Sequence, residues 1–99
     1  MILATFRCYL RSELPSDTDE LIRNLHASLT AVEGFEWTKD FVADDGEVLT
    51  LVQFNSQQAL DEWKTNPVHM AAKARASEIM REYSVVIADV RQQIGPTSS

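Results

Sequence analysis

Cysteine and runs of basic residues are scarce in this sequence. Among 99 residues there is one cysteine, Cys8, and fifteen acidic side chains outnumber nine basic ones to give a net charge of -6. A single cysteine excludes an intrachain disulfide framework and a cysteine-based zinc site, and it favours a reducing compartment, so we expect a cytoplasmic protein. Without a cluster of lysine and arginine, neither nucleic acid nor an anionic membrane is an expected partner.

Long apolar segments and the common catalytic loops are also missing. The opening residues lack the basic start and long apolar core of a signal peptide, and no apolar stretch approaches the length of a bilayer span. No Gly-rich phosphate loop, GxSxG elbow, HExxH helix or EF-hand loop occurs, which argues against nucleotide, zinc-protease and calcium chemistry. A hydrophobic content of 44% suits one soluble domain. We expect that domain over residues 1–94, a flexible tail over 95–99, and no cofactor or metal.

Hydrophobic periodicity predicts a strand and then a helix in the first third of the chain. Residues 2–10 alternate, with apolar side chains on both faces of the expected strand. After residue 16 the period changes, because leucine and valine recur every three or four positions up to Val32. Ser16 is the expected N-cap, acidic residues complement the positive end of the helix dipole, and Gly34 ends the helix.

A hairpin is the strongest local prediction. Two alternating runs, 35–42 and 47–54, flank the pair Asp45-Gly46, and glycine tolerates the positive φ that such a turn requires. On the first of these strands, alternation places three large aromatic side chains on one face: Phe35, Trp37 and Phe41.

Two helices and a final strand are expected after the hairpin. Ser56 should start a short helix that carries Trp63. The pair Asn66-Pro67 interrupts it, because proline is disfavoured inside a helix but suits the first turn behind an asparagine cap. A new helix then leads into a β-branched strand, and its expected apolar stripe consists of Val68, Ala72, Ala76, Ile79 and Tyr83.

This order of elements matches the ferredoxin-like βαββαβ plan. It is an α+β fold in which both helical segments lie on one face of a four-stranded antiparallel sheet. Every expected strand is apolar on both sides, so the face without helices would be a large apolar patch, and such patches usually mark interfaces. We therefore expect a homodimer in which two sheets pack face to face.

Two charged residues interrupt apolar strands. Arg7 and Asp89 fall in the middle of the first and last expected strands, where a charge should be paired or should face a cavity. The pair could line a cleft or bridge a dimer interface, and the sequence does not choose between these two roles.

Three segments resemble the antibiotic biosynthesis monooxygenase family of small dimeric α+β barrel proteins: "GFEW", "DGEVLTLVQFNSQQALDEW" and "NPVHMAAKARASEIMREYSVVIADV". The resemblance extends over nearly the whole chain and implies the fold and the dimer. It leaves the chemistry open, because such barrels host cofactor-free oxygenases, haem-degrading enzymes, isomerases and proteins without demonstrated activity.

The haem-degrading branch of this family matches poorly. Its members need an asparagine on the first strand, a tryptophan after the third strand and a histidine further along as the iron ligand. When the sequences are aligned on Trp63, this chain has Phe6 in place of the asparagine and Lys73 in place of the ligand. A protonated lysine has no lone pair to give to iron, and His69 lies one helical turn too early.

The cofactor-free oxygenase branch matches better. The resemblance implies an activated phenol or hydroquinol that gives its own electrons to dioxygen once it is deprotonated, in an apolar pocket between sheet and helices. Trp63 would lie against the aromatic ring, and His69 would be the base. Arg7 or Tyr83 would donate a hydrogen bond to the developing oxyanion.

Each of these residues also has a purely structural interpretation. Trp63 suits a packing anchor, His69 a solvated or capping position, and Tyr83 a core ring whose hydroxyl bonds a carbonyl. His26 is expected at the surface, and Cys8 as an inert buried thiol. The alternative function is therefore a non-catalytic dimeric module that binds a small hydrophobic ligand. A titratable side chain pointing into the pocket beside Trp63 would favour the enzyme.

Overall fold

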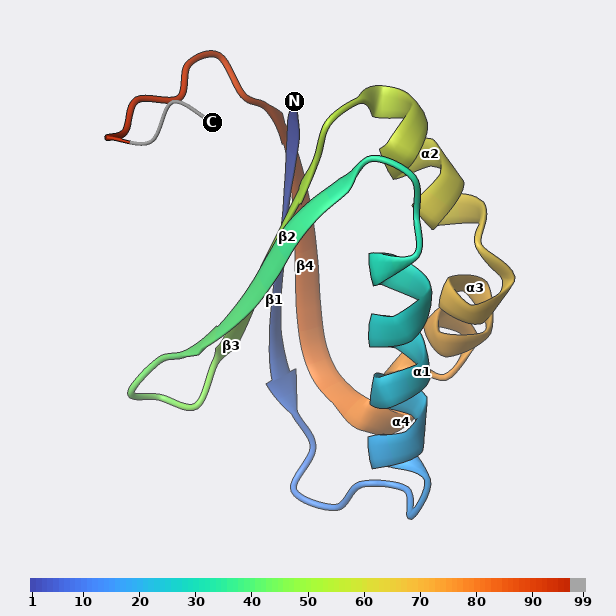
Figure 1. The fold of residues 1–99 in the computed structure, drawn as a ribbon. Coiled ribbons are helices and arrows are strands. Elements are labelled where there is room, and N and C mark those ends of the chain that lie inside the picture. Colours follow the sequence, from blue (N-terminus) through green and yellow to red (C-terminus); the bar gives the residue numbers. More distant parts are fainter. Residues whose placement is uncertain (97–99) are drawn as a thin grey trace.

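The chain folds as one four-stranded antiparallel sheet with a layer of helices on one side (Figure 1). The computed structural model describes residues 1–96, and the last three residues of the expected tail lie outside this range. Strands pair in the order β2-β3-β1-β4, which confirms the ferredoxin-like prediction. The elements are β1 (Ile2–Leu10), α1 (Thr18–Thr30), β2 (Phe35–Val42), β3 (Val48–Phe54), α2 (Gln57–Thr65), α3 (Pro67–Ala74), α4 (Ala76–Ile79) and β4 (Met80–Asp89).

The core lies at one end of the interface between sheet and helices. Residues directly opposite one another on neighbouring strands share a face, so the pairing register sorts the helix-facing side chains into rows that cross the sheet. Leu29 of α1 and Leu60 of α2 are buried against two of these rows. We call them the core rows, and they consist of Phe35, Phe54, Ile2 and Asp89, and of Thr38, Val52, Ala4 and Ile87.

The other half of the helix-facing surface is less covered. α3 packs on α1 and α2, and the largest buried cluster lies under α1 and α2, against the core rows. Tyr83 and Val85 face the helix side but stay 57% and 52% exposed. The two rows on this half, here called the outer rows, consist of Asp40, Thr50, Phe6 and Val85, and of Val42, Val48, Cys8 and Tyr83.

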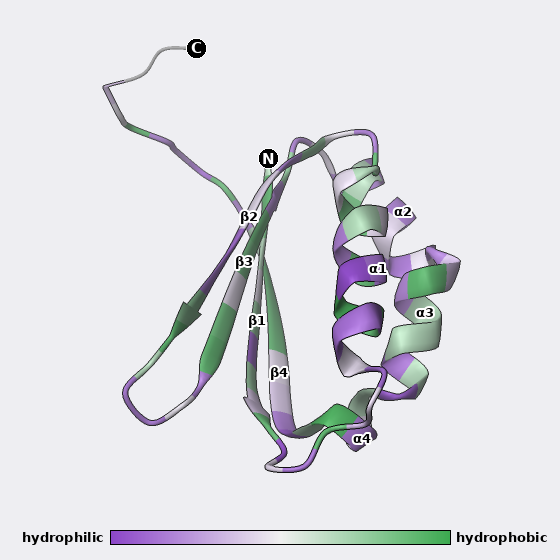
Figure 2. Cartoon of the chain, turned by 60° about the horizontal axis from the view of Figure 1, so that its bottom comes forward, coloured by the Kyte–Doolittle hydropathy of each residue, from purple (hydrophilic) through white to green (hydrophobic). Residues whose placement is uncertain are grey.

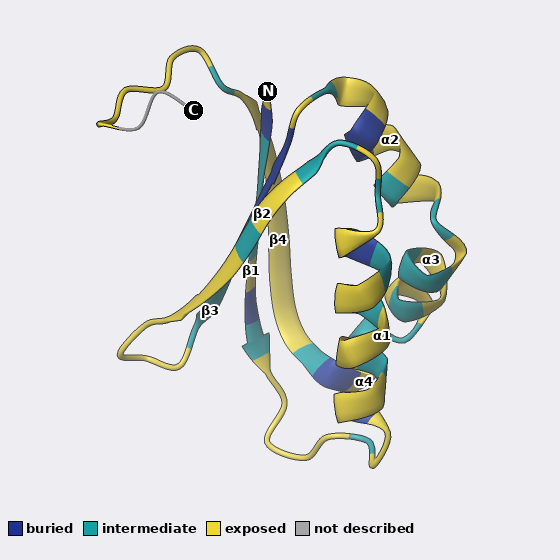
Figure 3. Cartoon of the chain, in the orientation of Figure 1, coloured by how far each residue is buried: buried dark blue, intermediate teal, exposed yellow. Residues whose placement is uncertain are grey.

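The opposite sheet face carries no helix and exposes large apolar side chains, as expected, with Arg7 and Lys39 among them. Trp37 and Phe41 of β2 are 40% and 45% exposed there, and Val86 of β4 is also exposed. Figure 3 shows β4 exposed along almost its whole length, and Figure 2 shows hydrophobic residues in all four strands. We call this helix-free surface the open face. No helix among residues 1–96 is long and apolar enough to cross a bilayer.

Two predicted helix starts are confirmed. The side chain of Ser56 accepts a hydrogen bond from the Ala59 N–H at 3.2 Å, and Pro67 begins α3 directly after the break. Asn66 Oδ1 accepts from the backbone N–H groups of Val68 and His69, at 2.9 and 3.3 Å. These bonds satisfy N–H groups that a helix start leaves without partners, which fixes the bend between α2 and α3.

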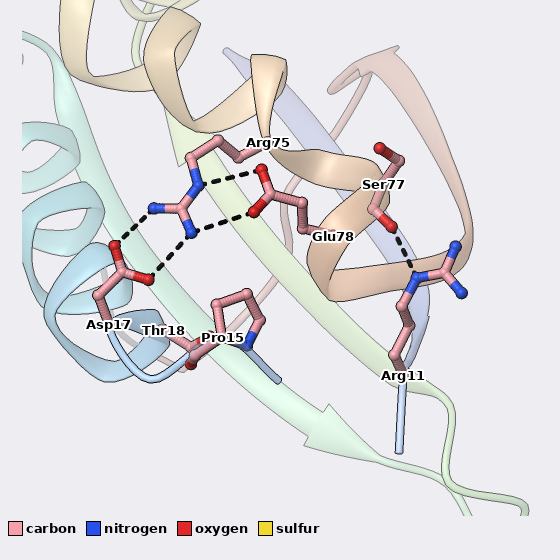
Figure 4. Close-up of polar contacts among 7 residues, drawn as sticks. All are labelled: Arg11, Pro15, Asp17, Thr18, Arg75, Ser77 and Glu78. Carbon is pink, nitrogen blue, oxygen red and sulfur yellow. Dashed lines mark hydrogen bonds and ion pairs between the residues drawn. The ribbon is translucent and has the colours of Figure 1, made fainter. Parts of the chain in front are cut away.

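The expected Ser16 cap of the first helix is wrong. The N-cap is Asp17, and its side chain makes no capping bond. Its carboxylate instead binds the Arg75 guanidinium at 2.6 and 2.9 Å, while Arg75 Nε donates to Glu78 at 3.2 Å (Figure 4). A charge-assisted fork is stronger than a neutral cap, so Asp17 ties the start of α1 to the corner between α3 and α4.

The last helix is shorter than predicted. It ends at Ala74, a separate turn runs over Ala76–Ile79, and β4 begins at Met80. Tyr83 therefore lies in β4, opposite Cys8, and not on the helical stripe. The strand extends this far because β1 offers backbone partners up to Leu10, and that pairing overrides the helical period of the sequence.

One aromatic residue of the hairpin faces the other way from the prediction. The pairing register of β2 with β3 shifts between Phe35 and Trp37. This irregularity changes the alternation, so Phe35 packs on the core while Trp37 and Phe41 stay on the open face. The hairpin itself is as predicted, with Gly46 at a φ of +91°.

Candidate functional site

Trp63 and His69 lie together in the helix layer. The bend at Asn66 folds the start of α3 back along α2, so the imidazole stacks on the indole with ring centroids 4.3 Å apart and an interplanar angle of 12°. Trp63 is half-buried and packs against the core cluster. The two residues therefore form one flat aromatic unit beside the core rows.

The hydrogen bond of His69 selects its tautomer. Its Nδ1 lies 2.9 Å from the backbone oxygen of Trp63. A carbonyl oxygen only accepts, so Nδ1 carries the proton and the lone pair of a neutral imidazole is on Nε2. Burial lowers the pKa of His69 below its usual 6.5, with the nearby Lys73 charge acting in the same direction and the bond to Trp63 acting against both. The side chain is thus a neutral base at pH 7.

Tyr83 belongs to the outer rows of the sheet. Its ring stacks on Phe6 of β1, with centroids 5.9 Å apart and an interplanar angle of 23°. The side chain is more than half exposed and not the core ring suggested by its sequence position. A phenol at this place, on the helix-facing side, can donate a hydrogen bond to a bound molecule.

Arg7 lies on the open face, and it lines a small hollow at the end of β1 and β4 together with Tyr83 but not with Trp63 or His69. Its Nε and Nη2 donate to the Glu47 carboxylate at 3.1 and 2.9 Å, and this pairing raises the Arg7 pKa above its usual value. The expected pairing of Arg7 with Asp89 does not occur, because Asp89 lies opposite Ile2 on the helix-facing side. Tyr9, next to this pair, donates to Asp45.

Two hollows lie elsewhere on the described surface. One of about 390 Å³ lies between α1 and α2, and its lining includes Ser28, Glu62 and Asn66. The other, of about 140 Å³, lies at the end of β1 and β4 beside Arg7 and Glu82. Neither is lined by Trp63 or His69, which pack beside the core rows.

The sequence prediction missed Asp40 and Thr50 of the outer rows. Thr50 Oγ1 donates to Asp40 Oδ1 at 2.5 Å, on the helix-facing side. A signal was present, since Asp40 is a charged residue in the middle of an expected strand, as Arg7 and Asp89 are. Cys8, in the neighbouring row, is buried as expected, and its pKa is raised by burial and by the charges of Asp40 and Glu47.

The residues at the haem-binding positions do not fit a haem. Phe6 is stacked on Tyr83, and its hydrocarbon ring offers no hydrogen bond. Lys73 is exposed on α3, and lysine is not among the usual protein ligands of haem iron. The chemistry of these two side chains therefore gives no ligand and no polar partner where that branch needs them.

Strand order and helix placement together define a small ferredoxin-like α+β protein. The chain superposes on Rv0793 from Mycobacterium tuberculosis with a TM-score of 0.80 at 20% identity, covering 95% of this chain and 98% of that one. It is also similar to SnoaB, a cofactor-independent oxygenase from Streptomyces nogalater, with a TM-score of 0.75 at 11% identity and 97% coverage of both chains.

A further solved structure has the same fold. A candidate antibiotic biosynthesis monooxygenase from Deinococcus radiodurans gives a TM-score of 0.81 at 10% identity, over 99% of this chain and all of that one. No model of a protein family and no curated protein matches the sequence. The resemblance to antibiotic biosynthesis monooxygenases is thus supported by structure, and at these identities the likeness is one of fold.

Proposed function

We propose that this protein is a cofactor-independent monooxygenase that oxidises a small phenol or hydroquinol with dioxygen. The observation that carries the proposal is the Trp63–His69 unit. A neutral imidazole with a free Nε2 is held against an indole by stacking and by one backbone hydrogen bond. An aromatic surface with a base beside it is what deprotonation of a phenol requires.

The reaction can be written with all atoms accounted for. His69 Nε2 takes the phenolic proton, and the electron-rich ring carbon forms a bond to dioxygen. The O–O bond of the resulting peroxide then breaks, the same carbon loses its hydrogen, and the proton held by His69 is returned. One oxygen atom stays on the ring as a quinone carbonyl, and the other leaves as water.

Tyr83 is the better of the two predicted oxyanion donors. It stands on the helix-facing side of the sheet, as Trp63 does, whereas Arg7 is engaged by Glu47 on the open face. A hydroxyl directed at developing negative charge lowers the barrier most where water is excluded. Closing the site against water would fall to the helix layer.

The active form in this proposal is a homodimer with open faces packed together. Trp37, Phe41 and Val86 support it, because together they expose an apolar surface that no helix covers. The Arg7–Glu47 pair neutralises the charge at one end of that surface. Two such sheets would form the shared barrel, and the reducing cytoplasm would suit the free Cys8.

Oxygen uptake with a panel of naphthols and naphthohydroquinones tests the function. Wild type should consume dioxygen without added metal or flavin, and His69→Ala should lower the rate at least about a hundredfold, as expected for loss of a general base. His26→Ala is the matched control, since His26 is exposed on α1 and should leave the rate unchanged.

Trp63→Phe keeps an aromatic ring but loses most of the stacking area, so it should mainly raise KM. If the protein binds these compounds and consumes no dioxygen, the alternative of a passive ligand-binding module is correct. If it turns them over with His69→Ala as active as wild type, the assignment of the base is wrong.

A further inference from the structure

Asp40 and Thr50 form a polar pair in an otherwise apolar and aromatic part of the sheet. They share an outer row with Phe6 and Val85, and the next row carries Tyr83. Asp40 is exposed, while Thr50 and Phe6 are half-buried. The pair is therefore accessible from the same side of the sheet as the aromatic surface.

The hydrogen bond within the pair fixes what it can offer to a ligand. A threonine hydroxyl has one proton, and Thr50 gives it to Asp40 Oδ1 at 2.5 Å. An ionised carboxylate has no proton to give and keeps the lone pairs of its second oxygen. Both side chains consequently present acceptors only, and a ligand bound there must bring the donor.

The neighbouring aromatic rings suit a flat ligand. Phe6 and Tyr83 are stacked with centroids 5.9 Å apart. Phe6 is directly opposite Thr50, and Asp40 is on the next strand, so with strands about 4.8 Å apart the Cα atoms of Phe6 and Asp40 are about 10 Å apart across the sheet. A bicyclic aromatic molecule resting on Phe6 would carry a ring substituent to Asp40.

We propose that Asp40, supported by Thr50, binds a ring hydroxyl of a reduced aromatic ligand and discriminates against the corresponding quinone. A phenol or hydroquinol donates a hydrogen bond to the carboxylate. A quinone carbonyl can only accept, so its oxygen lone pairs would face those of the carboxylate, which is repulsive. Tyr83 can donate or accept and therefore does not distinguish the two forms. The proposal rests on the proposed function, for which it names the reduced ring hydroxyl as the feature that is recognised.

This discrimination has a consequence for turnover. In a hydroquinol one hydroxyl gives its proton to His69 and the second donates to Asp40, and both are carbonyls in the quinone product. The product then loses its hydrogen bond in the site while the next substrate molecule can make one. Asp40 would thus favour exchange of product for substrate as well as selection of substrate.

Anaerobic binding of one ligand in two oxidation states tests the proposal without turnover. The probes are dimethylnaphthoquinone, in which methyl groups block addition of thiols to the quinone ring, and its hydroquinone, titrated by tryptophan fluorescence. Wild type should bind the hydroquinone at least about tenfold more tightly, a ratio typical of one hydrogen bond to a charged group. Asp40→Asn should bring the ratio close to one, because an amide can donate to the quinone.

Asp44→Asn is the matched control, as it removes a carboxylate from the exposed hairpin turn and should keep the wild-type ratio. Thr50→Val should also keep most of the preference, since Asp40 retains its charge. A ratio near one in wild type, or the same ratio in wild type and Asp40→Asn, would overturn the proposal. If the ratios are as expected but no dioxygen is consumed, the oxygenase function fails while this binding site stands.

Discussion

At the scale of single residues, His69 is fixed from three directions. Its backbone N–H is bound by Asn66, its ring stacks on Trp63, and its Nδ1 donates to the Trp63 carbonyl. Together these contacts immobilise the imidazole and leave Nε2 without its proton. A side chain prepared in this way needs no conformational change before it accepts a proton.

The depressed pKa of His69 predicts the pH dependence of the reaction. Below its pKa the imidazole is protonated and has no lone pair on Nε2. Activity is therefore lost as pH falls through the pKa, and the full rate is reached at pH values above it. Because burial lowers the pKa, the midpoint of the acidic limb of kcat/KM should lie below 6.5. A pH profile from acid to neutral measures this midpoint, and a midpoint above 6.5 would contradict the assignment.

The sequence predicted some of these residues and not others for a physical reason. Trp63 and His69 are brought together by a local signal, the Asn66-Pro67 bend, which can be recognised without knowledge of the fold. Arg7 and Asp40 depend on which face of a strand each occupies, and that is set by pairing with distant residues. The site could thus be predicted where it is local and not where it depends on the sheet.

At the scale of elements, the helix boundaries show the same distinction. Ser56 and Asn66 begin their helices as predicted, because each acts on N–H groups two or three residues away. Ser16 does not begin its helix, because the N-cap is Asp17, whose carboxylate binds Arg75. Arg75 lies 58 residues further along the chain. The boundary between α4 and β4 was also misplaced, because β1 supplies hydrogen-bond partners that the sequence period does not reveal.

Comparing the removal of the two helix caps, Ser56 and Asn66, distinguishes an effect on stability from an effect on activity. Asn66→Ala and Ser56→Ala should each lower the free energy of unfolding by about 1 kcal/mol, because each exposes backbone N–H groups at a helix start. Only Asn66→Ala also releases the backbone of His69, so it alone should lower kcat/KM, by about tenfold. Urea unfolding and steady-state kinetics on both variants provide the comparison. Equal kinetic effects would mean that the bend does not position the base.

At the scale of the whole molecule, the sheet has two unequal apolar surfaces. On one side the helices bury the core rows, and Tyr83 and Val85 of the outer rows stay exposed, while on the other side the open face is without cover. The order of strands and helices could be predicted from the sequence, because alternation and helical period are local. How much of the sheet the helices cover could not be predicted, since it depends on how α3 packs on α1 and α2.

A charge on the open face should disrupt the proposed dimer. Phe41→Glu replaces an apolar ring beside Lys39 with a carboxylate, whose burial in the interface costs free energy, and should weaken dimerisation at least about tenfold. Val42→Glu is the matched control, because Val42 is the next residue, points to the helix side and is 72% exposed. Sedimentation of both variants and wild type measures the effect. A wild-type chain that stays at 11.2 kDa at micromolar concentration would contradict the dimer.

The central claim is that this chain inserts one atom of dioxygen into a phenolic ring without help from a metal or flavin. The most direct measurement is a reaction of metal-free protein with a naphthol under isotopically labelled dioxygen, followed by mass spectrometry of the quinone and of the water formed. We predict one labelled oxygen atom in each quinone and the other in water. An unlabelled quinone accompanied by hydrogen peroxide would contradict the claim, as would a complete absence of turnover across the naphthol panel.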